Sequence, residues 1–328
     1  KDLIFFQADI HGNQLVRERV KTMRRLMENK PLTIVTTYAA LMTPLALWDR
    51  KSDVVDIERG GVLQESRLAE KLVAFGYEKS YQVESPGQFS VRGGIIDIFD
   101  LTEENPYRIE LWGDEVESIR SFDILSQRSI EKLESVSVFP ATEFVLDDTK
   151  VREGIKRLDA EAKHQEKVFR QSFKTEEAAR IHAQVSELKE QLIEFKSKLN
   201  LEGYIRYFYD DTVTLPEMLT HMSENQRGQE RPLFFLDEPV RLKEQAEAVE
   251  LEFRESMSRR AEKGLCLPGQ MNILYSGEEV AARLQGGSVV TISTMDTRGG
   301  YFKPERRIDV AARSLAPYNN SFEALVKD

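Results

Sequence analysis

The densest β-strand pattern of the chain lies between residues 81 and 144, and it constrains the fold more than any other feature. Its clearest strand is Tyr107–Trp112, in which three apolar residues alternate with Arg108, Glu110 and Trp112. Successive side chains of a strand point to opposite faces of a sheet. The alternation therefore predicts one apolar face and one face that carries an arginine, a carboxylate and an indole.

Neighbouring segments extend this pattern into a sheet. Apolar and polar residues alternate in Phe89–Arg92, and Gly93 and Gly94 then allow a tight turn or a bulge before a second strand at Ile95–Phe99. The apolar spacing in Glu115–Phe122 departs from a period of two, which predicts a bulge or a short strand there.

The face that carries Arg108 and Trp112 has two interpretations. In the first, Trp112 is half-buried and Arg108 stacks against its edge, which is the usual situation in a sheet. In the second, the face binds another protein, because Trp, Tyr and Arg dominate the energetics of protein interfaces. Alternation and composition are compatible with both.

Composition narrows the class of protein. With 41% hydrophobic and 31% charged residues in 328, we expect a soluble globular protein of two or three domains. No apolar run approaches the ~20 residues that span a bilayer. The chain begins with Lys1 and an apolar strand at Leu3–Phe6, which suggests a piece of a larger protein. The single Cys266 excludes an internal disulfide and favours a reducing cytoplasm.

The formal net charge of -10 opposes non-specific binding to phosphate backbones, which depends on Lys and Arg. The charge therefore favours protein partners over DNA.

The flanking segments predict an α/β domain. After the strand at Leu3–Phe6 we expect a helix at Val16–Lys30, a strand buried on both sides at Leu32–Thr37 and a helical segment at Tyr38–Leu47, an order typical of a parallel sheet. Later segments predict further helices and strands: a helical hairpin at Lys150–Phe173 and Thr175–Leu199, helices at Val240–Lys263 and Gly277–Leu284, and strands at Asn272–Tyr275 and Val289–Ser293.

A strand that ends in Asp237-Glu238 has the form of a Walker B motif, in which the Asp holds Mg²⁺ and the Glu orients water. The sequence contains no GxxxxGK[ST] phosphate-binding loop, and Pro239 follows directly. We therefore interpret Asp237 and Glu238 as a degenerate site or as a pair at a helix N-terminus.

No other group of residues supports catalysis or a cofactor. The histidines are far apart in the sequence and fit no metal-binding spacing: His11, His164, His182 and His221. The sequence contains no Gly-x-Ser-x-Gly motif. We expect no cofactor, no metal and no catalytic residue.

Three stretches resemble the second domain of the UvrB-like module of bacterial transcription-repair coupling factors (Mfd). They read FSVRGGIIDIFDL, PYRIELWGDEVESIRSFD, and QRS followed by VFPATEF. The resemblance implies a split α/β domain of a degenerate helicase-like, P-loop-type fold, formed by residues 1–54 and 143–328. An inserted α+β domain would occupy residues 55–142.

The resemblance also implies a function. In that family the second domain docks onto the repair protein UvrA, and the contacts would fall on Arg92, Arg108 and Trp112. The full-length protein would be an ATP-dependent translocase that also engages RNA polymerase and double-stranded DNA. For the present chain we expect a non-enzymatic, monomeric, cytoplasmic module.

Two alternatives remain open at this stage. One is an ATP-dependent helicase of the UvrB type, although only Gln7–Gln14 lie where UvrB has a long hairpin that probes DNA. The other is a module that chiefly binds DNA through its first and third parts, which would give a steep dependence of affinity on salt.

Overall fold

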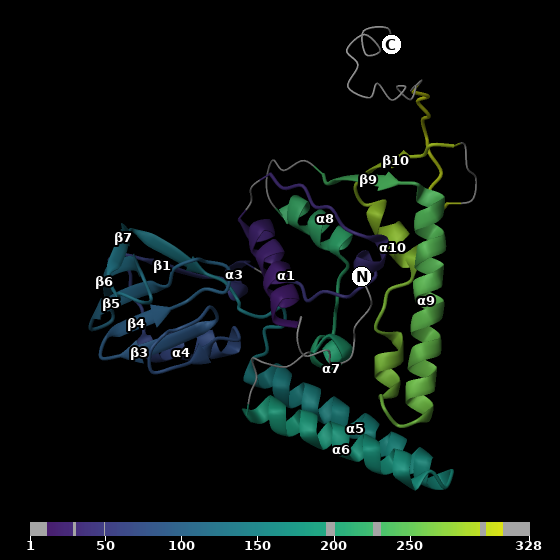
Figure 1. The fold of residues 1–328 in the computed structure, drawn as a ribbon, viewed down its shortest axis with the longest axis horizontal. Coiled ribbons are helices and arrows are strands. Elements are labelled where there is room, and N and C mark those ends of the chain that lie inside the picture. The colour runs from purple at the N-terminus through teal and green to yellow at the C-terminus, as the bar shows by residue number, and fades with distance from the viewer. Residues whose placement is uncertain are drawn as a thin grey trace, which may run out of the picture.

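The computed structural model describes residues 12–28, 31–48, 50–194, 201–225, 231–295 and 300–310. The strand predicted at Leu3–Phe6 lies outside these residues, as does His11. A β-rich region forms the left end of the molecule in Figure 1, and long helices form its lower and right sides.

Six strands form the larger sheet, in the spatial order β2-β3-β4-β5-β6-β7. Their bounds are Glu78–Lys79 (β2), Gln88–Arg92 (β3), Ile95–Ile98 (β4), Tyr107–Trp112 (β5), Glu115–Phe122 (β6) and Ser129–Leu133 (β7). All neighbours from β3 to β7 pair in an antiparallel manner, and β2 pairs with β3 in a parallel manner. The bulge predicted for Glu115–Phe122 is confirmed, because the register between β5 and β6 shifts after Glu110.

One face of this sheet is covered by helix α4 (Glu65–Ala74). Leu68 and Leu72 lie one helical turn apart and are both buried in the core between the helix and the sheet. The strands contribute Phe89, Ile96 and Ile109 to the same core. The helix ends before Gly76, whose φ of 86° is the left-handed conformation that glycine adopts readily. The opposite face of the sheet carries the polar side chains.

A second, two-stranded ribbon joins the sheet to the rest of the chain. It consists of β1 (Val55–Glu58) and β8 (Ser135–Val138), which pair in an antiparallel manner. Strand β8 follows β7 after Glu134 alone, so the chain passes directly from the larger sheet into the ribbon.

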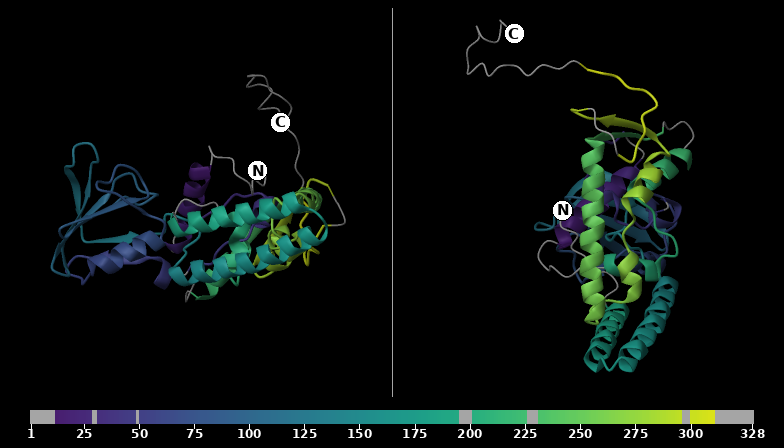
Figure 2. Two further views of the ribbon diagram at one scale, coloured as in Figure 1. Left: turned by 90° about the horizontal axis from the view of Figure 1, so that it is seen from below. Right: turned by 90° about the vertical axis from the view of Figure 1, so that its right-hand side faces the viewer.

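Two long helices form an antiparallel hairpin, as the sequence predicted: α5 (Asp148–Gln171) and α6 (Thr175–Glu194). The carboxylate of Asp147 caps α5 by accepting a hydrogen bond from the Lys150 backbone N–H at 2.7 Å. Leu158 of α5 and Ile181 of α6 are fully buried in one shared core. Figure 2 shows the two helices side by side along the underside of the molecule.

Segments before and after the β-rich region pack on one another. Their elements are α1 (Gly12–Met27), α2 (Tyr38–Leu41), α3 (Arg50–Asp53), α7 (Ile205–Phe208), α8 (Leu215–Asn225), β9 (Leu233–Asp237), α9 (Pro239–Glu262), α10 (Gly277–Leu284) and β10 (Ser288–Ile292), with 3-10 turns at Glu202–Tyr204 and Pro268–Asn272. Tyr38 and Met42 share a core with Leu236 and Val280. Strands β9 and β10 pair in a parallel manner.

Two predicted strands are wrong. Leu32–Thr37 forms no strand, and Val35 is 95% exposed, because strand preference reflects packing on a sheet and no described strand lies against this segment. Asn272–Tyr275 is also not a strand: Asn272 ends a 3-10 turn, and Ile273 and Tyr275 are buried in two different hydrophobic cores. Periodicity cannot distinguish a short buried run of this kind from a strand. The helix predicted at Tyr38–Leu47 is limited to Tyr38–Leu41.

The fold is therefore a mixed α/β fold whose larger sheet is mostly antiparallel. Within the described residues, parallel pairing is limited to β9 with β10 and β2 with β3. No helix in this part of the chain is long and apolar enough to cross a membrane.

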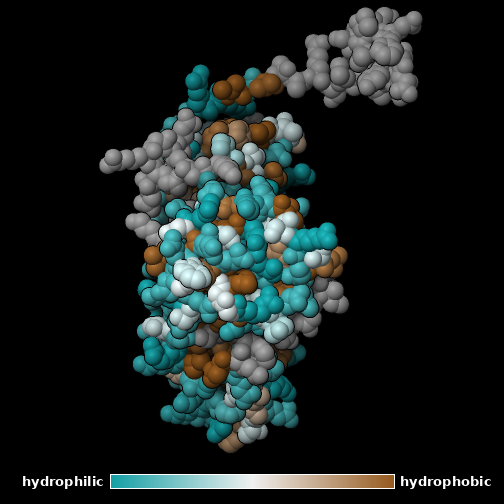
Figure 3. Space-filling view, turned by 90° about the vertical axis from the view of Figure 1, so that its left-hand side faces the viewer, coloured by the Kyte–Doolittle hydropathy of each residue, from teal (hydrophilic) through white to brown (hydrophobic). Residues whose placement is uncertain are grey.

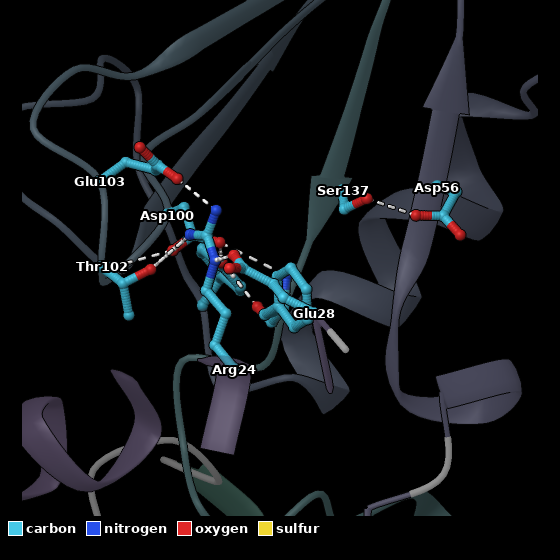
Figure 4. A network of polar contacts seen from close by, with 9 residues as sticks. Arg24, Glu28, Asp56, Asp100, Thr102, Glu103 and Ser137 are labelled. Atoms are coloured by element: carbon cyan, nitrogen blue, oxygen red, sulfur yellow. Dashed lines mark hydrogen bonds and ion pairs between the residues drawn. The ribbon is translucent and has the colours of Figure 1, made fainter. Parts of the chain in front are cut away.

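A buried polar network connects α1 to the β-rich region (Figure 4). Arg24 of α1 lies 3.2 Å from the carboxylate of Asp100, whose side chain is 1% exposed. The same guanidinium contacts Glu28, Thr102 and Glu103. Burial lowers the pKa of Arg24, but the negative charges of Asp100 and Glu103 raise it more, so the net shift is upward.

Further hydrogen bonds hold Asp100 in place. Its carboxylate accepts from the Thr102 backbone N–H and hydroxyl, each at 2.8 Å, and from the Tyr77 hydroxyl at 3.3 Å. Burial raises the pKa of Tyr77 well above its usual value, and the negative charge of Asp100 raises it further. The network thus fixes the β-rich region against α1.

Candidate partner-binding site

The three residues assigned to partner binding lie on one face of the six-stranded sheet, opposite to α4. Directly paired residues of antiparallel strands carry their side chains on the same face. Asp97 pairs with Arg108, which pairs with Arg120, and in the next row Arg92 pairs with Ile95, which pairs with Glu110. Trp112 follows by alternation along β5. We call this surface the arginine face and define it by Arg92, Asp97, Arg108, Glu110, Trp112 and Arg120.

The centre of the arginine face is the carboxylate of Asp97, whose side chain is 1% exposed. Arg108 holds it with two hydrogen bonds, from Nε at 2.6 Å and from Nη2 at 2.8 Å. Arg92 adds a third, from its Nη2 at 3.0 Å. Two guanidinium groups on one carboxylate leave this cluster with a net positive charge, and bidentate geometry of this kind fixes the orientation of an arginine.

The side chain of Arg108 is fixed by three hydrogen bonds and by contact with an aromatic ring. Its guanidinium lies 4.2 Å from the centre of the Phe122 ring, and its Nη2 donates a hydrogen bond to Gln127 Oε1 at 2.9 Å. The hydrogen bonds to Asp97 raise the pKa of Arg108, although burial opposes the shift. The interpretation in which Arg108 stacks against the edge of Trp112 is therefore wrong, because the ring against its guanidinium is Phe122.

A second ion pair lies beside the first. Glu110 of β5 contacts Arg120 of β6, and it accepts a hydrogen bond from the Ser118 hydroxyl at 2.6 Å. The bulge after Glu110 lets Ser118 and Arg120 share this face, so the register shift positions a third arginine.

Trp112 is the exposed apolar residue of this face. It ends β5, and 80% of its side chain is exposed, so the interpretation of a half-buried indole is wrong. Gly113, with a φ of 63°, forms the turn that leads directly into β6, so Trp112 lies at the end of β5, past the last residue that pairs with β4. Tyr81, which is also exposed, lies under the Arg92 guanidinium at 5.8 Å.

Sequence reasoning missed Asp97, Phe122 and Gln127, which organise the site. A signal for Asp97 was available: it is a single carboxylate within the apolar strand Ile95–Ile98, next to a strand that carries an arginine. A buried charge requires a partner, and Arg108 is the charge directly opposite.

The second candidate pair lies elsewhere, at the end of β9. Asp237 is exposed, and Glu238 adopts a left-handed φ of 51° at the N-terminus of α9. The Glu238 carboxylate makes no cap but accepts from the Thr294 backbone N–H at 2.8 Å and from the Thr294 hydroxyl at 2.6 Å. These hydrogen bonds lower the pKa of Glu238. The pair is separate from the arginine face (Figure 1).

Metal-binding geometry is not found in the described part of the chain, where no three His, Cys, Asp or Glu residues are grouped to hold an ion. His182, one of the four histidines considered in the sequence, lies on the helical hairpin, and its Nδ1 is 3.1 Å from Glu166 Oε1. The end of the molecule formed by the β-rich region is largely hydrophilic, with scattered apolar residues (Figure 3).

Comparison with known proteins identifies the region that carries the arginine face. Residues 55–144 match the family model of the UvrB interaction domain. The chain carries a UvrB interaction domain. All residues that define the arginine face lie within the matched segment, and the resemblance found in the sequence is thereby confirmed.

Relatives extend the similarity to the whole chain. A transcription-repair-coupling factor of Bacillus subtilis (strain 168) is 30% identical over 327 residues, which is 99% of this chain and 26% of the relative. One from Staphylococcus haemolyticus is 29% identical over 85% of this chain and 23% of its own length. UvrABC system protein B of Kosmotoga olearia is 28% identical over 63% of this chain and 31% of its own length. The chain thus spans about a quarter to a third of these relatives.

Proposed function

We propose that the chain is the module of a transcription-repair coupling factor that recruits UvrA, and that the arginine face is its docking surface. The observation that carries the proposal is an exposed tryptophan beside a fixed, positively charged pair of arginines within a UvrB interaction domain. Tryptophan and arginine supply much of the energy of protein interfaces.

The contacts of Arg92, Arg108 and Trp112 indicate a different role for each residue in binding UvrA. Arg108 uses Nε and Nη2 within the protein, so its role is to hold Asp97 and to shape the surface. Arg92 is more exposed, with 37% of its side chain accessible, and presents the remaining donors of its guanidinium to a carboxylate of UvrA. Trp112 supplies the apolar anchor.

Recruitment would link UvrA to stalled RNA polymerase, which the rest of the full-length protein would engage together with double-stranded DNA. Names of the relatives, which pair transcription with repair, support this proposal. The chain itself would be a cytoplasmic, monomeric module without a cofactor.

The finer architecture belongs to the same proposal. We propose that residues 1–54 and 143–328 form one split α/β domain of the degenerate P-loop type, with residues 55–142 inserted. Support comes from the parallel pair β9 and β10 and from the core that Tyr38 and Met42 share with Leu236. Apolar side chains on one face of this pair are exposed, among them Phe235 and Ile292, and in parallel sheets such a face is normally covered by helices.

We propose that this module does not hydrolyse ATP. The sequence has no phosphate-binding loop, and the Glu238 carboxylate is held by Thr294. An assay of ATP hydrolysis by the purified chain, with and without DNA, tests this point. Turnover that Asp237→Asn abolishes would contradict it and would favour the UvrB-type helicase.

Binding to UvrA is tested by surface-immobilised UvrA and the purified chain. We expect Trp112→Ala to lower the affinity by ~2 kcal/mol or more, as for an interface hot spot. The matched control is Ile193→Ala, which removes an exposed apolar side chain from α6, far from the arginine face. Equal loss of affinity in both variants, or in neither, would show that the docking surface is wrong.

A further inference from the structure

The turn between α5 and α6 contains an aromatic residue in an unfavourable conformation. Phe173 has a φ of 60°, and 93% of its side chain is exposed. The backbone N–H of Lys174 donates to the Phe169 carbonyl at 2.9 Å, and that of Phe173 donates to the Arg170 carbonyl at 3.1 Å. This pair of bonds is the Schellman arrangement, whose left-handed position is usually glycine because it disfavours a Cβ.

Phe173 gives the fold nothing that compensates for this strain. The aromatic residue that packs in the hairpin is Phe169, which is buried, whereas Phe173 extends into solvent. Bulky residues in a left-handed conformation are uncommon, and strained residues of this kind cluster at functional sites. The turn therefore presents an aromatic ring at an energetic cost to the fold.

Exposed cations lie along the part of α5 that leads into this turn. Lys163, Lys167 and Arg170 recur at spacings of four and three along α5, so they share one side of the helix, and Lys174 follows the turn. All four are exposed. We call Lys163, Lys167 and Arg170 the stripe, and a shallow hollow of about 380 Å³ lies among their side chains.

The stripe is little neutralised. Glu166 is the single acidic residue between positions 163 and 174, and its carboxylate lies 3.1 Å from His182 Nδ1 and 3.5 Å from Arg170 Nη2. No ion pair is found for Lys163, Lys167 or Lys174 within the described part of the chain. These three cations stand out in a chain whose formal net charge is -10.

We propose that this turn binds single-stranded or unpaired DNA, with the lysines on phosphates and the Phe173 ring stacked on a base. Proteins that bind single strands combine cationic side chains that follow the backbone with aromatic rings on which bases stack. From Lys163 to Arg170 the stripe covers ~10 Å of helix, about the length of three phosphates of one strand.

This inference is independent of the proposed docking of UvrA. The turn lies at the lower right of Figure 1, at the other end of the molecule from the six-stranded sheet. Variants of one site therefore leave the other intact, and the failure of one proposal does not affect the other.

The test is the fluorescence anisotropy of a labelled 12-nucleotide oligo(dT) titrated with the purified chain at low salt. We expect the double variant Lys163→Glu, Lys167→Glu to weaken binding at least tenfold. The matched control is Arg152→Glu, Lys156→Glu, which reverses two exposed charges near the other end of α5 and should leave the affinity unchanged. The slope of log K against log salt should be about -2, from three phosphates at ~0.7 each.

Phe173→Gly separates binding from folding. Glycine adopts the left-handed conformation without strain, so this variant should unfold at an equal or higher temperature and yet bind oligo(dT) several-fold more weakly. Unchanged affinity in Phe173→Gly would overturn the stacking role of the ring.

Three further results would overturn the proposal as a whole: no binding of oligo(dT) by the unmodified chain, equal affinities for the reversed and control variants, or equally effective competition by poly-glutamate. The last result would indicate an acidic protein surface as the partner. Tighter binding of a duplex of equal length would exclude an unpaired base as the target.

Discussion

Replacing Arg24 with methionine removes the guanidinium that connects α1 to the β-rich region while keeping the aliphatic length of the side chain. Asp100 would then remain buried, with its side chain 1% exposed, but without its cation. Removing one partner of a buried ion pair costs about 3–5 kcal/mol, because the other charge stays desolvated.

The cost should be lower here. Asp100 keeps hydrogen bonds from the Thr102 backbone N–H, the Thr102 hydroxyl and the Tyr77 hydroxyl. Arg24 itself is 15% exposed. We therefore expect Arg24→Met to lower the free energy of unfolding by about 2–3 kcal/mol.

Urea unfolding followed by circular dichroism measures this change. The control is the double variant Arg24→Met, Asp100→Asn, which also removes the buried negative charge and should recover part of the loss, as a double-mutant cycle would show. A loss below about 0.5 kcal/mol in the single variant, the range of ordinary surface substitutions, would refute the reasoning.

Three more predictions concern the core. Burial raises the pKa of Tyr77 in the folded state, so the contribution of this residue to stability is fully present below the unfolded pKa of ~10 and is lost as the pH rises above that value. Tyr77→Phe should therefore flatten the fall in unfolding free energy between pH ~9 and ~11. Burial raises the pKa of Cys266 to about 11, so a thiol reagent at pH 8 should react with it only on unfolding. Gly154→Ala should destabilise the protein by about 1–3 kcal/mol in a thermal melt despite the better helix propensity, because the new Cβ would lie 2.2 Å from Phe208.

The β-rich region was predictable because its signals are local. Alternation in Tyr107–Trp112 gave the strand and its two faces, and the broken period in Glu115–Phe122 gave the bulge. Each of these depends on residues that are neighbours in the sequence.

Other features depend on distant partners and were not predictable. Leu32–Thr37 has the composition of a buried strand, but only a neighbouring strand could make it one. Exposure of Trp112 follows from its place at the end of β5, past the residues that pair with β4. The ring partner of Arg108 is Phe122, which lies on the next strand and is distant in the sequence. The left-handed turn at Phe173 has no signal in the sequence, since glycine is the expected residue there.

The most direct test of the docking surface is a calorimetric titration of UvrA with the purified chain and with the variant Arg92→Ala, Trp112→Ala. Arg108 is left intact so that Asp97 keeps its main cation. We predict binding in the low-micromolar range or tighter for the unmodified chain, about -8 kcal/mol, and a loss of at least tenfold in the variant. Equal dissociation constants for the two proteins would contradict the account.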